Sequence, residues 1–415
     1  MSIGPVPAPQ QTDQAVQATA ELPGLNTTRA LPYIRRGLPA LRVLLVIPSF
    51  EGGGAERAWV TLLHAFSQHP MTVHVARFRP GGIFEDGLPP GFPRHVVRGR
   101  RGDPRVVFPL ARLIRQVRPD AVVSVLRYAN IVALLAARLS RVRTRVIVNE
   151  QNHPEIEFAQ HYGAAVKRRI LRWVYPLADG VTVISRGISD ALIARAGVSA
   201  SRVRVIPNPI DAQTVAVLAA ASCPHPWLAS TGQVPVVVAA GRLVPQKGFD
   251  TLLHAFRVVR DAHHARLIIL GTGPLDGKLR ALQDRLGLSA DVDFPGFDPN
   301  PYRYFARAAC VVVASRYEGF GNVIVEAMAC GTPVVATRCP SGPEEIITDG
   351  RTGLLVPVDD ITALSAAILR VLSDEPTAVL LRREGASRVL DFSVDRVADQ
   401  YLQFFDEVLV RPTRV

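Results

Sequence analysis

Two glutamates, Glu318 and Glu326, stand eight positions apart in the segment SRYEGFGNVIVEAMACGTPVVA, residues 315–336. The segment is typical of the end of a buried strand, a glycine turn and a helix that begins near Asn322. If the chain between the two glutamates were helical throughout, their carboxylates would lie about 12 Å apart. That separation exceeds the roughly 5 to 9.5 Å of a glycosidase acid and base pair. We therefore expect the carboxylates to bind separate hydroxyl groups rather than to share one proton transfer.

The turn between the glutamates is suited to an anion. Gly319, Phe320 and Gly321 lead into the predicted helix start at Asn322 and Val323. There, free backbone N–H groups and the helix dipole attract negative charge. A phosphate flanked by two hydroxyl-binding carboxylates matches a nucleotide sugar, which carries ribose hydroxyls on one side of its diphosphate and sugar hydroxyls on the other. The sequence thus predicts a nucleotide-sugar site around this turn.

Two further glycine-containing loops follow predicted strands. The loop GRLVPQKGF places Gly241, Arg242 and Lys247 together. Two such cations can clamp a diphosphate, the arginine as a planar fork and the lysine as a point charge; a solvated pair of loop cations is the alternative. The turn GTGP, which holds Gly273, would bring backbone close to a ligand, although glycine turns after strands also serve packing.

These loops need a scaffold of parallel strands. Apolar, β-branched segments alternate with helical ones from LRVLLVIPSF at 41–50 to IPNPID at 206–211, and again from VPVVVAAG at 234–241 to TPVVAT at 332–337. This alternation predicts an α/β fold with two Rossmann-like, doubly wound domains that face each other across a cleft. Ligands of such sheets bind beyond the carboxyl ends of the strands.

Composition suggests four parts in the chain. Residues 1–38 are rich in Pro, Gln, Ala and Thr without a period, so we expect a disordered leader. An N-terminal domain at 39–211 and a C-terminal domain at 212–392 follow. For the last segment, 393–415, we expect a helix that packs back across either domain. A candidate position for this helix is on the N-terminal domain.

The net charge is +12, and nearly all of the basic excess is arginine. Basic residues cluster in the first half at Arg98, Arg100, Arg101, Arg105, Arg141, Arg143, Arg145 and in VKRRILRW at 166–173. Nucleic acid or an anionic membrane surface would each fit this charge, and a solvated arginine-rich surface is the bland alternative. We find no nucleic-acid-binding motif and few aromatic residues among the basic ones, which favours the membrane.

The segment HYGAAVKRRILRWVYPLADG at 161–180 mixes basic and apolar residues. It fits an interfacial helix on a membrane and equally a core helix with an arginine face. No apolar run reaches the roughly 18 residues that span a bilayer, and the leader lacks an apolar signal core. We expect a cytoplasmic protein, with peripheral attachment to the inner membrane as a candidate. The four cysteines have no CxxC spacing, so we expect buried thiols.

The chain resembles the retaining glycosyltransferases of the GT-B type, in the large bacterial family with a Glu-x7-Glu motif (glycosyl transferases group 1, family 4). The resemblance covers about residues 41–410 and rests on the segments GGGAERA, IPNPID, GRLVPQKGFDTLLHAF, ILGTGP, FPGF, SRYEGFGNVIVEAMACGTPVVATRCPSGPEEII and DGRTGLLVPVDD. It implies that the N-terminal domain lies on the acceptor side and that the C-terminal domain binds the nucleotide sugar.

The resemblance also implies residue roles. Glu326 would hold the ribose hydroxyls, and Glu318 the donor sugar and its phosphate. Arg242 and Lys247 would hold the diphosphate. The implied donor-binding residues are Gly53, Gly54, Gly241, Arg242, Lys247, Gly273, Glu318, Gly319, Phe320, Gly321, Asn322, Val323 and Glu326. Gly52, Gly53 and Gly54 would let their loop approach the donor phosphate or the acceptor. These glycines form no Walker motif, because the Lys-Ser/Thr ending is absent.

Catalysis would rest on Glu318, Arg242, Lys247 and one candidate histidine. Family members commonly carry a histidine just past the strand that corresponds to VIVNE. In NEQNHP that histidine, His153, comes one or two positions late. Gln151 or Asn152 is therefore an alternative occupant of its site, and a surface histidine is the alternative interpretation of His153.

The implied reaction needs no metal or other cofactor. DVD at 291–293 has no further ligand cluster nearby, which argues against a metal site. The implied donor is a UDP-linked hexose or N-acetylhexosamine, from the resemblance of TRCPSGPEEII to members with such donors. The implied acceptor is a polyprenyl-diphosphate-linked or growing glycan of exopolysaccharide or lipopolysaccharide assembly, without nucleic acid.

Three other functions are alternatives to a glycosyltransferase. A GT-B nucleotide-sugar epimerase would convert donor without acceptor, and a non-catalytic nucleotide-sugar-binding scaffold would only bind it. A dinucleotide oxidoreductase is disfavoured, since no GxGxxG follows a strand with an acidic residue about twenty positions on.

Overall fold

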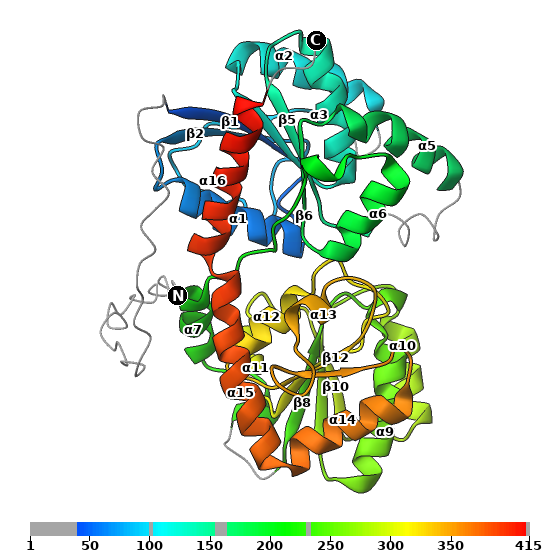
Figure 1. Ribbon diagram of the computed structural model, residues 1–415. Helices are drawn as coiled ribbons and strands as arrows, with labels where there is room; N and C mark the ends of the chain where they lie inside the picture. The colour runs from blue at the N-terminus through cyan, green and yellow to red at the C-terminus, as the bar shows by residue number, and fades with distance from the viewer. Residues whose placement is uncertain (1–39, 99–102, 154–163, 230–233, 412–415) are drawn as a thin grey trace, which may run out of the picture. The chain divides into compact units, whose positions relative to one another are not determined.

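The computed structural model describes residues 40–98, 103–153, 164–229 and 234–411 (Figure 1). The predicted leader at 1–38 lies outside these ranges, as do Arg100 and Arg101. All described residues belong to one compact unit, which holds two separate parallel sheets. The predicted α/β fold with two doubly wound sheets is therefore confirmed.

The first sheet consists of seven parallel strands. They are β1 (Leu41–Ile47), β2 (Met71–Arg77), β3 (Arg94–Val96), β4 (Ala121–Val125), β5 (Arg145–Glu150), β6 (Gly180–Val183) and β7 (Val203–Val205), in the order β3-β2-β1-β4-β5-β6-β7. β4 and β5 are buried at every position, as central strands covered on both faces must be. β3 has no counterpart in the sequence-based prediction, because RHV at the sheet edge has no apolar pattern.

Helices cover both faces of this sheet. α1 (Gly54–Phe66) and α16 (Val394–Val410) share a core with the strand residues Val43, Leu45 and Ile47. The alternate strand residues Leu44 and Val46 face the other core. Helices that contribute to that core are α2 (Val107–Val117), α3 (Arg127–Ser140), α5 (Ala164–Val174) and α6 (Arg186–Ala196). The period-two alternation of β1 thus separates the two helical layers.

The C-terminal helix α16 follows the second sheet in the chain but packs on the first. The Tyr401 ring lies edge-on to Trp59 of α1, with ring centroids 5.3 Å apart. Phe404 and Phe405 are buried beside it. The sequence left open on which domain this helix packs, and in the structure it packs on the N-terminal sheet.

The second sheet consists of six parallel strands. They are β8 (Val236–Ala240), β9 (Arg266–Leu270), β10 (Val292–Gly296), β11 (Cys310–Val313), β12 (Val334–Thr337) and β13 (Leu354–Val356), in the order β10-β9-β8-β11-β12-β13. Its helices are α7 (Ala212–Ala220), α8 (Pro226–Ala229), α9 (Phe249–Ala262), α10 (Asp276–Arg285), α11 (Tyr302–Phe305), α12 (Asn322–Ala329), α13 (Pro343–Ile346), α14 (Ile361–Ser373) and α15 (Glu375–Val389). The predicted helix start at Asn322 is confirmed.

The strand order places the predicted site loops together. β8 lies between β9 and β11, so the loops after these three strands leave from neighbouring points on one edge of the sheet. Ligands of doubly wound sheets bind at this edge.

None of the helices within the described ranges combines the length and the apolar character needed to cross a lipid bilayer. All four cysteines are free, and Cys223, Cys310 and Cys339 are buried.

Candidate functional site

Glu318 meets Lys247 at the carboxyl edge of the second sheet. Its Oε1 accepts hydrogen bonds from Lys247 Nζ at 2.5 Å and from the Ser315 hydroxyl at 2.6 Å. The lysine ends a short 3-10 turn, Pro245–Lys247, after β8, and the glutamate follows β11. The two side chains meet because β8 and β11 are paired neighbours. Two loops that were predicted separately therefore form one charged site.

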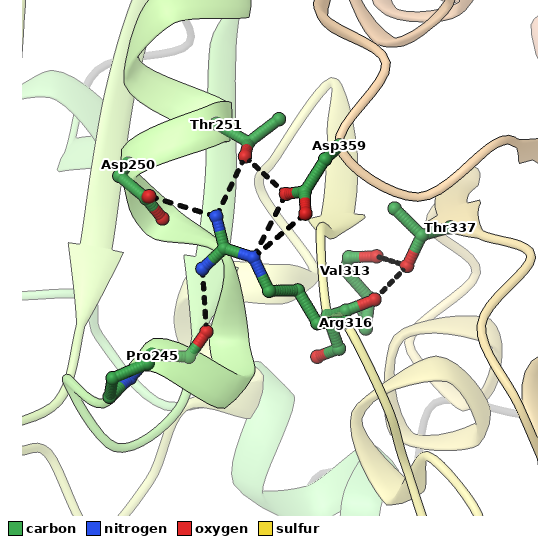
Figure 2. A network of polar contacts seen from close by, with 8 residues as sticks. Pro245, Asp250, Thr251, Val313, Arg316, Thr337 and Asp359 are labelled. Atoms are coloured by element: carbon green, nitrogen blue, oxygen red, sulfur yellow. Dashed lines mark hydrogen bonds and ion pairs between the residues drawn. The ribbon is translucent and has the colours of Figure 1, made fainter.

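Arg316 ties the same two loops together (Figure 2). Its backbone N–H donates to Gln246 O at 2.8 Å, and its guanidinium donates to Pro245 O at 2.7 Å and to Asp250 Oδ2 at 2.8 Å. A third edge of the guanidinium donates to Asp359 at 2.9 Å. The bond to Asp250, followed by that to Asp359, raises the pKa of this arginine above its ordinary value. The arginine thus stays charged and holds the lysine-bearing turn against the glutamate-bearing loop.

Glu326 lies on α12 in a different network. Its Oε1 is 3.1 Å from Arg57 Nη1 of α1 and 3.4 Å from the Tyr302 hydroxyl. Arg57 also donates to that hydroxyl at 2.7 Å. Burial, followed by the Glu326 carboxylate, raises the pKa of Tyr302 well above its ordinary value. The phenol therefore stays protonated and can donate to the carboxylate.

The two glutamates have no partner in common in these contacts. Glu318 is held by a lysine and a serine, whereas Glu326 is held by an arginine and a tyrosine. The arrangement agrees with two separate binding carboxylates and does not resemble an acid and base pair that shares a proton.

The N-terminal ends of α1 and α12 touch each other. A Cβ atom added at Gly54, the first residue of α1, would collide with Asn322 Nδ2, the side chain of the first residue of α12. Gly53 is the N-cap of α1, and Gly321, with φ +102°, is the N-cap of α12. The positive dipole ends of two helices thus lie close together, which favours an anion. The Glu56 carboxylate lies beside Gly53 at the start of α1.

A chain of buried amides runs from the first sheet to the start of α12. Gln151 and Asn208 exchange hydrogen bonds of 3.3 Å and 3.2 Å, and Asn208 Nδ2 donates to Asn322 Oδ1 at 3.1 Å. The backbone O of Gln151 also lies so close to Gly319 that a Cβ there would collide with it. The structure therefore brings Gln151 to the turn between the two glutamates.

The candidate catalytic histidine, His153, lies farther along the chain than Gln151. His153 is half-buried at the end of the described stretch after β5, two residues beyond Gln151, and Asn152 is exposed. Of the three residues that the sequence left open, Gln151 is the one whose backbone oxygen lies against Gly319. The catalytic role of His153 stays a prediction.

The remaining loop residues differ in how they are placed. Arg242 is exposed, and its side chain has no hydrogen-bond or ion-pair partner among the residues that the structure describes. A Cβ at Gly241 would come within 3.4 Å of the Lys247 side chain. A Cβ at Gly273 would meet the backbone of Leu243 at 2.5 Å. Close packing of two loops therefore accounts for glycine at 273, as in the alternative noted from the sequence.

Phe320 turns its side chain away from the helix starts. It is buried and packs edge-on against Phe392, with centroids 5.5 Å apart. Only its backbone is available to a ligand at the turn. Val323, in the first turn of α12, is half-buried.

The acidic residues of DVD are engaged in ion pairs. Asp291 accepts from Arg260 at 2.6 Å, and Asp293 accepts from His225 at 2.9 Å. Within the described ranges, no group of three or more His, Cys, Asp or Glu side chains is arranged to hold a metal ion. That the reaction needs no metal stays a prediction.

Sequence reasoning missed several residues of this site, namely Arg57, Ser315, Arg316, Tyr302 and Asn208. Four of them lie inside segments that were quoted as motifs: Arg57 in GGGAERA, Asn208 in IPNPID, and Ser315 and Arg316 in SRYEGFG. Their place in motifs was a signal, but their partners lie on other elements. Tyr302 has no such signal.

The chain matches two descriptions of known families. "Glycosyltransferase Family 4" matches residues 52–214, most of the first sheet with its helices. "Glycosyl transferases group 1" matches residues 234–374, the whole second sheet.

Similar proteins extend over nearly the full length. One is the N-acetylgalactosamine-N,N'-diacetylbacillosaminyl-diphospho-undecaprenol 4-alpha-N-acetylgalactosaminyltransferase of Campylobacter jejuni. It is 28% identical over 371 residues, 87% of this chain and 98% of that protein. Another is the GDP-mannose-dependent alpha-(1-6)-phosphatidylinositol monomannoside mannosyltransferase of Mycobacterium tuberculosis. It is 30% identical over 365 residues, 83% of this chain and 92% of that protein.

Similar solved structures share the fold. Anabaena Alr3699/HepE in complex with UDP has a TM-score of 0.75 at 22% identity, covering 88% of this chain and 100% of that one. Sucrose-phosphate synthase from Thermosynechococcus elongatus has a TM-score of 0.71 at 21% identity, covering 89% of this chain and 99% of that one.

Proposed function

The chain belongs to the GT-B glycosyltransferases of group 1 and family 4, and we propose that it moves a hexosyl or N-acetylhexosaminyl group from a nucleotide sugar to a glycan acceptor with retention of the anomeric configuration. The observation that carries the proposal is the contact of Lys247 with Glu318 at the carboxyl edge of the second sheet. Around it lie the groups that a nucleotide diphosphate needs.

The diphosphate is assigned to two cations and two helix starts. Lys247 supplies a point charge that is already positioned by its glutamate. The side chain of Arg242 is exposed and has no partner among the described residues, so its planar fork can close on phosphate oxygens. The N–H groups at the starts of α1 and α12, at Gly54 and Asn322, add hydrogen bonds to the same anion.

The ribose hydroxyls are assigned to Glu326. A carboxylate binds two neighbouring hydroxyls by accepting a hydrogen bond from each. In the structure its Oε1 is engaged by Arg57 and Tyr302. A bound ribose would therefore have to replace or share at least the arginine contact.

The sugar and its phosphate are assigned to Glu318 and the backbone of the turn that follows it. Because the side chain of Phe320 is buried against Phe392, its backbone and that of Gly321 face the ligand. Gly319 lies against Gln151 of the first sheet, so a sugar at this turn would also be near residues of the acceptor-side domain.

The proposed chemistry is a substitution on one face of the sugar. The bond between the anomeric carbon and the diphosphate oxygen breaks, and the acceptor oxygen bonds to the same face of that carbon. The acceptor's proton passes to the leaving phosphate oxygen, so no side chain has to act as nucleophile. Lys247 and Arg242 stabilise the charge that grows on the diphosphate. Because these cations supply the charge, we expect turnover without a divalent metal or another cofactor.

The base and the acceptor are the finer parts of the proposal. We favour a UDP-linked donor: the segment TRCPSGPEEII resembles that of such enzymes, and a structure with this fold is a complex with UDP. In this chain Gly342 of that segment packs directly on the Phe320 carbonyl, next to the donor turn. The mycobacterial relative is named for GDP-mannose, so the base needs a direct test.

The acceptor is proposed to be a lipid-linked or growing envelope glycan. The Campylobacter relative is named for a diphospho-undecaprenol-linked acceptor, and another relative, LpsE of Rhizobium meliloti, is named for lipopolysaccharide core biosynthesis. We place the reaction in the cytoplasm, at the inner membrane that would carry such an acceptor.

A thermal-shift screen against UDP, GDP, ADP and their common sugars tests the donor site. One nucleotide series should raise the unfolding temperature, because a ligand present at about a hundred times its Kd adds about 2.7 kcal/mol of stability. Glu326→Ala should lose this response, and Glu375→Ala, an exposed carboxylate on α15, should keep it. Stabilisation by none of the three nucleotides would contradict the donor site.

A further inference from the structure

The outer surfaces of α2, α3 and α5 combine exposed apolar side chains with arginines. On α5, Trp173 is 71% exposed and Val166 is 63% exposed, although both are large hydrophobic residues. The exposed apolar residues of the three helices are Phe108, Leu135, Leu139, Val166, Ile170 and Trp173. We call this surface the α2-α3-α5 face. Exposed apolar residues gathered on adjacent helices mark an interaction site more often than single ones do.

The exposed residues of α5 follow the helical period. Val166, Ile170 and Trp173 are spaced i, i+4 and i+7, so they form one stripe. Leu171, which points to the core, is buried. Arg169 and Arg172 are exposed on the outer side beside the stripe. The outer side of α5 therefore carries an apolar stripe with arginines beside it. The core packing of this helix involves a different side, the one that carries Leu171.

The two neighbouring helices continue the pattern. Phe108 and Arg112 of α2 are exposed and one turn apart, and Leu135, Arg138 and Leu139 of α3 share one outer stripe. α3 contacts both α2 and α5, and Figure 1 shows these helices on the same part of the first sheet. The exposed side chains of the α2-α3-α5 face therefore come from three helices that are neighbours in the fold.

The arginines of this face have no acidic partners in the part of the chain that the structure describes. Within the described ranges, none of the exposed Arg112, Arg115, Arg138, Arg168, Arg169 and Arg172 forms an ion pair or a hydrogen bond through its side chain. The sequence of α5, AAVKRRILRWV, has no acidic residue at all. On α15, by contrast, Arg382 and Arg383 pair with nearby glutamates. The positive charge of the α2-α3-α5 face is therefore available to an external anion.

We propose that the α2-α3-α5 face docks on a bilayer that contains anionic phospholipid, with Trp173 and Ile170 inserted at the level of the headgroups. Arginines attract the anionic headgroups, while tryptophan and aliphatic side chains bury their surface at the acyl boundary. A nucleic acid would use the charge but leave the aliphatic stripe in water. The face therefore fits a lipid surface better than a polyanion.

The inference goes beyond the proposed reaction, because it concerns where the protein works rather than which sugar it transfers. It explains how a chain without a membrane-crossing helix in its described ranges could reach a lipid-linked acceptor. It can fail while the donor site stands, since nucleotide binding is measured without vesicles.

Vesicle co-sedimentation tests the docking. The protein should bind vesicles that contain phosphatidylglycerol at low salt, bind them less at high salt, and bind phosphatidylcholine vesicles weakly. Arg169→Gln/Arg172→Gln should weaken binding by at least about tenfold, because each arginine near an anionic surface contributes about fivefold. Arg382→Gln/Arg383→Gln on α15 is the matched control, because it also removes two arginine charges from a single helix. Equal loss in the control, or no preference for the anionic vesicles, would overturn the proposal.

Tryptophan fluorescence gives a second readout that does not depend on charge. Trp59 is buried and Trp227 is half-buried, so Trp173 is the exposed one of the three tryptophans. Its emission should shift to shorter wavelength when anionic vesicles are added, and the shift should be absent in Trp173→Phe. A shift that survives this substitution, or a shift caused equally by a soluble RNA, would contradict insertion of this face.

Discussion

Arg57 Nη1 lies 3.1 Å from Glu326 Oε1, in an ion pair that joins helix α1 on the first sheet to helix α12 on the second. The pair lies 269 positions apart in sequence. The same carboxylate is the one that we assign to the ribose of the donor. The Glu326 oxygen that we propose for the ribose is therefore engaged by a side chain from the other sheet, and a ribose bound there would compete with Arg57 for it.

Removal of Arg57 should separate stability from nucleotide affinity. Arg57→Gln leaves a mostly buried carboxylate without its cation, so the free energy of unfolding should fall by about 1 kcal/mol. Nucleotide affinity should stay the same or rise, because the competitor is gone. Chemical denaturation and calorimetric titration measure the two effects. A loss of affinity as large as that of Glu326→Gln would show instead that the arginine binds the nucleotide.

The contact of the two helix starts predicts a strong effect of one methyl group. Gly54→Ala places a Cβ against Asn322 Nδ2 and must push the asparagine or separate the helices. A displacement of this kind near the reacting groups should lower kcat/KM by about tenfold or more. Gly277→Ala on α10, where a Cβ meets nothing within 4 Å, should leave kcat/KM unchanged. Equal activity of the two variants would show that the helix starts do not have to touch.

Arg316 should act on turnover through position alone. Arg316→Gln removes the guanidinium bonds to Pro245, Asp250 and Asp359, so the lysine-bearing turn loses its tie to the glutamate-bearing loop. We expect kcat to fall by about tenfold or more. Arg316→Lys should not rescue it, because an ammonium lacks the planar fork.

The matched control for this arginine is Arg260→Gln, which also breaks an ion pair of the second domain, with Asp291. It should lower stability without a comparable fall in kcat. Equal falls in kcat would point to general destabilisation in both variants.

A histidine pair on the first sheet predicts a pH-dependent stability. His74 Nδ1 lies 3.0 Å from His95 Nε2. Burial lowers the pKa of His74, as do the neighbouring His95 and Arg42, and burial lowers the pKa of His95. The unfolded chain therefore binds more protons below the ordinary histidine pKa of about 6.5. This contribution to stability is complete above that pH and is lost as the pH falls through it toward the lowered values.

Denaturation midpoints at about pH 7.5 and about pH 5.5 measure this effect. The midpoint should fall at the lower pH, and His74→Gln should reduce the fall. His264→Gln, an exposed histidine, should not. An unchanged pH dependence in the first variant would exclude the pair as its source.

The sequence predicted the second sheet and its loops well, because each site residue there follows an apolar, β-branched strand. Lys247 and Glu318 could each be placed at a strand end. Their contact could not be derived, since it depends on β8 and β11 being neighbours although 71 positions separate the two residues. The strand order is a property of the topology that local pattern does not contain.

Other features could not be predicted from the sequence, and the physical reason differs from one feature to the next. β3 and β13 are three residues long, too short for a period. The close packing of Gly273 on the Leu243 backbone joins two separate loops, which local pattern does not contain; the donor-binding role of Gly273 stays a prediction. Arg57 and Tyr302 reach Glu326 only through tertiary contact, so their types alone gave no indication of a shared site.

The most direct test of the central claim is turnover of the Lys247→Ala variant. The release of UDP from UDP-sugars would be measured with a polyprenyl-diphosphate-linked glycan acceptor, and Lys278→Ala, an exposed lysine on α10, serves as the control. If Lys247 stabilises the leaving diphosphate, the first variant should lose about a hundredfold or more in kcat and the control should retain full activity. A loss of less than about threefold, worth well under 1 kcal/mol of transition-state stabilisation, would contradict the assignment of this site.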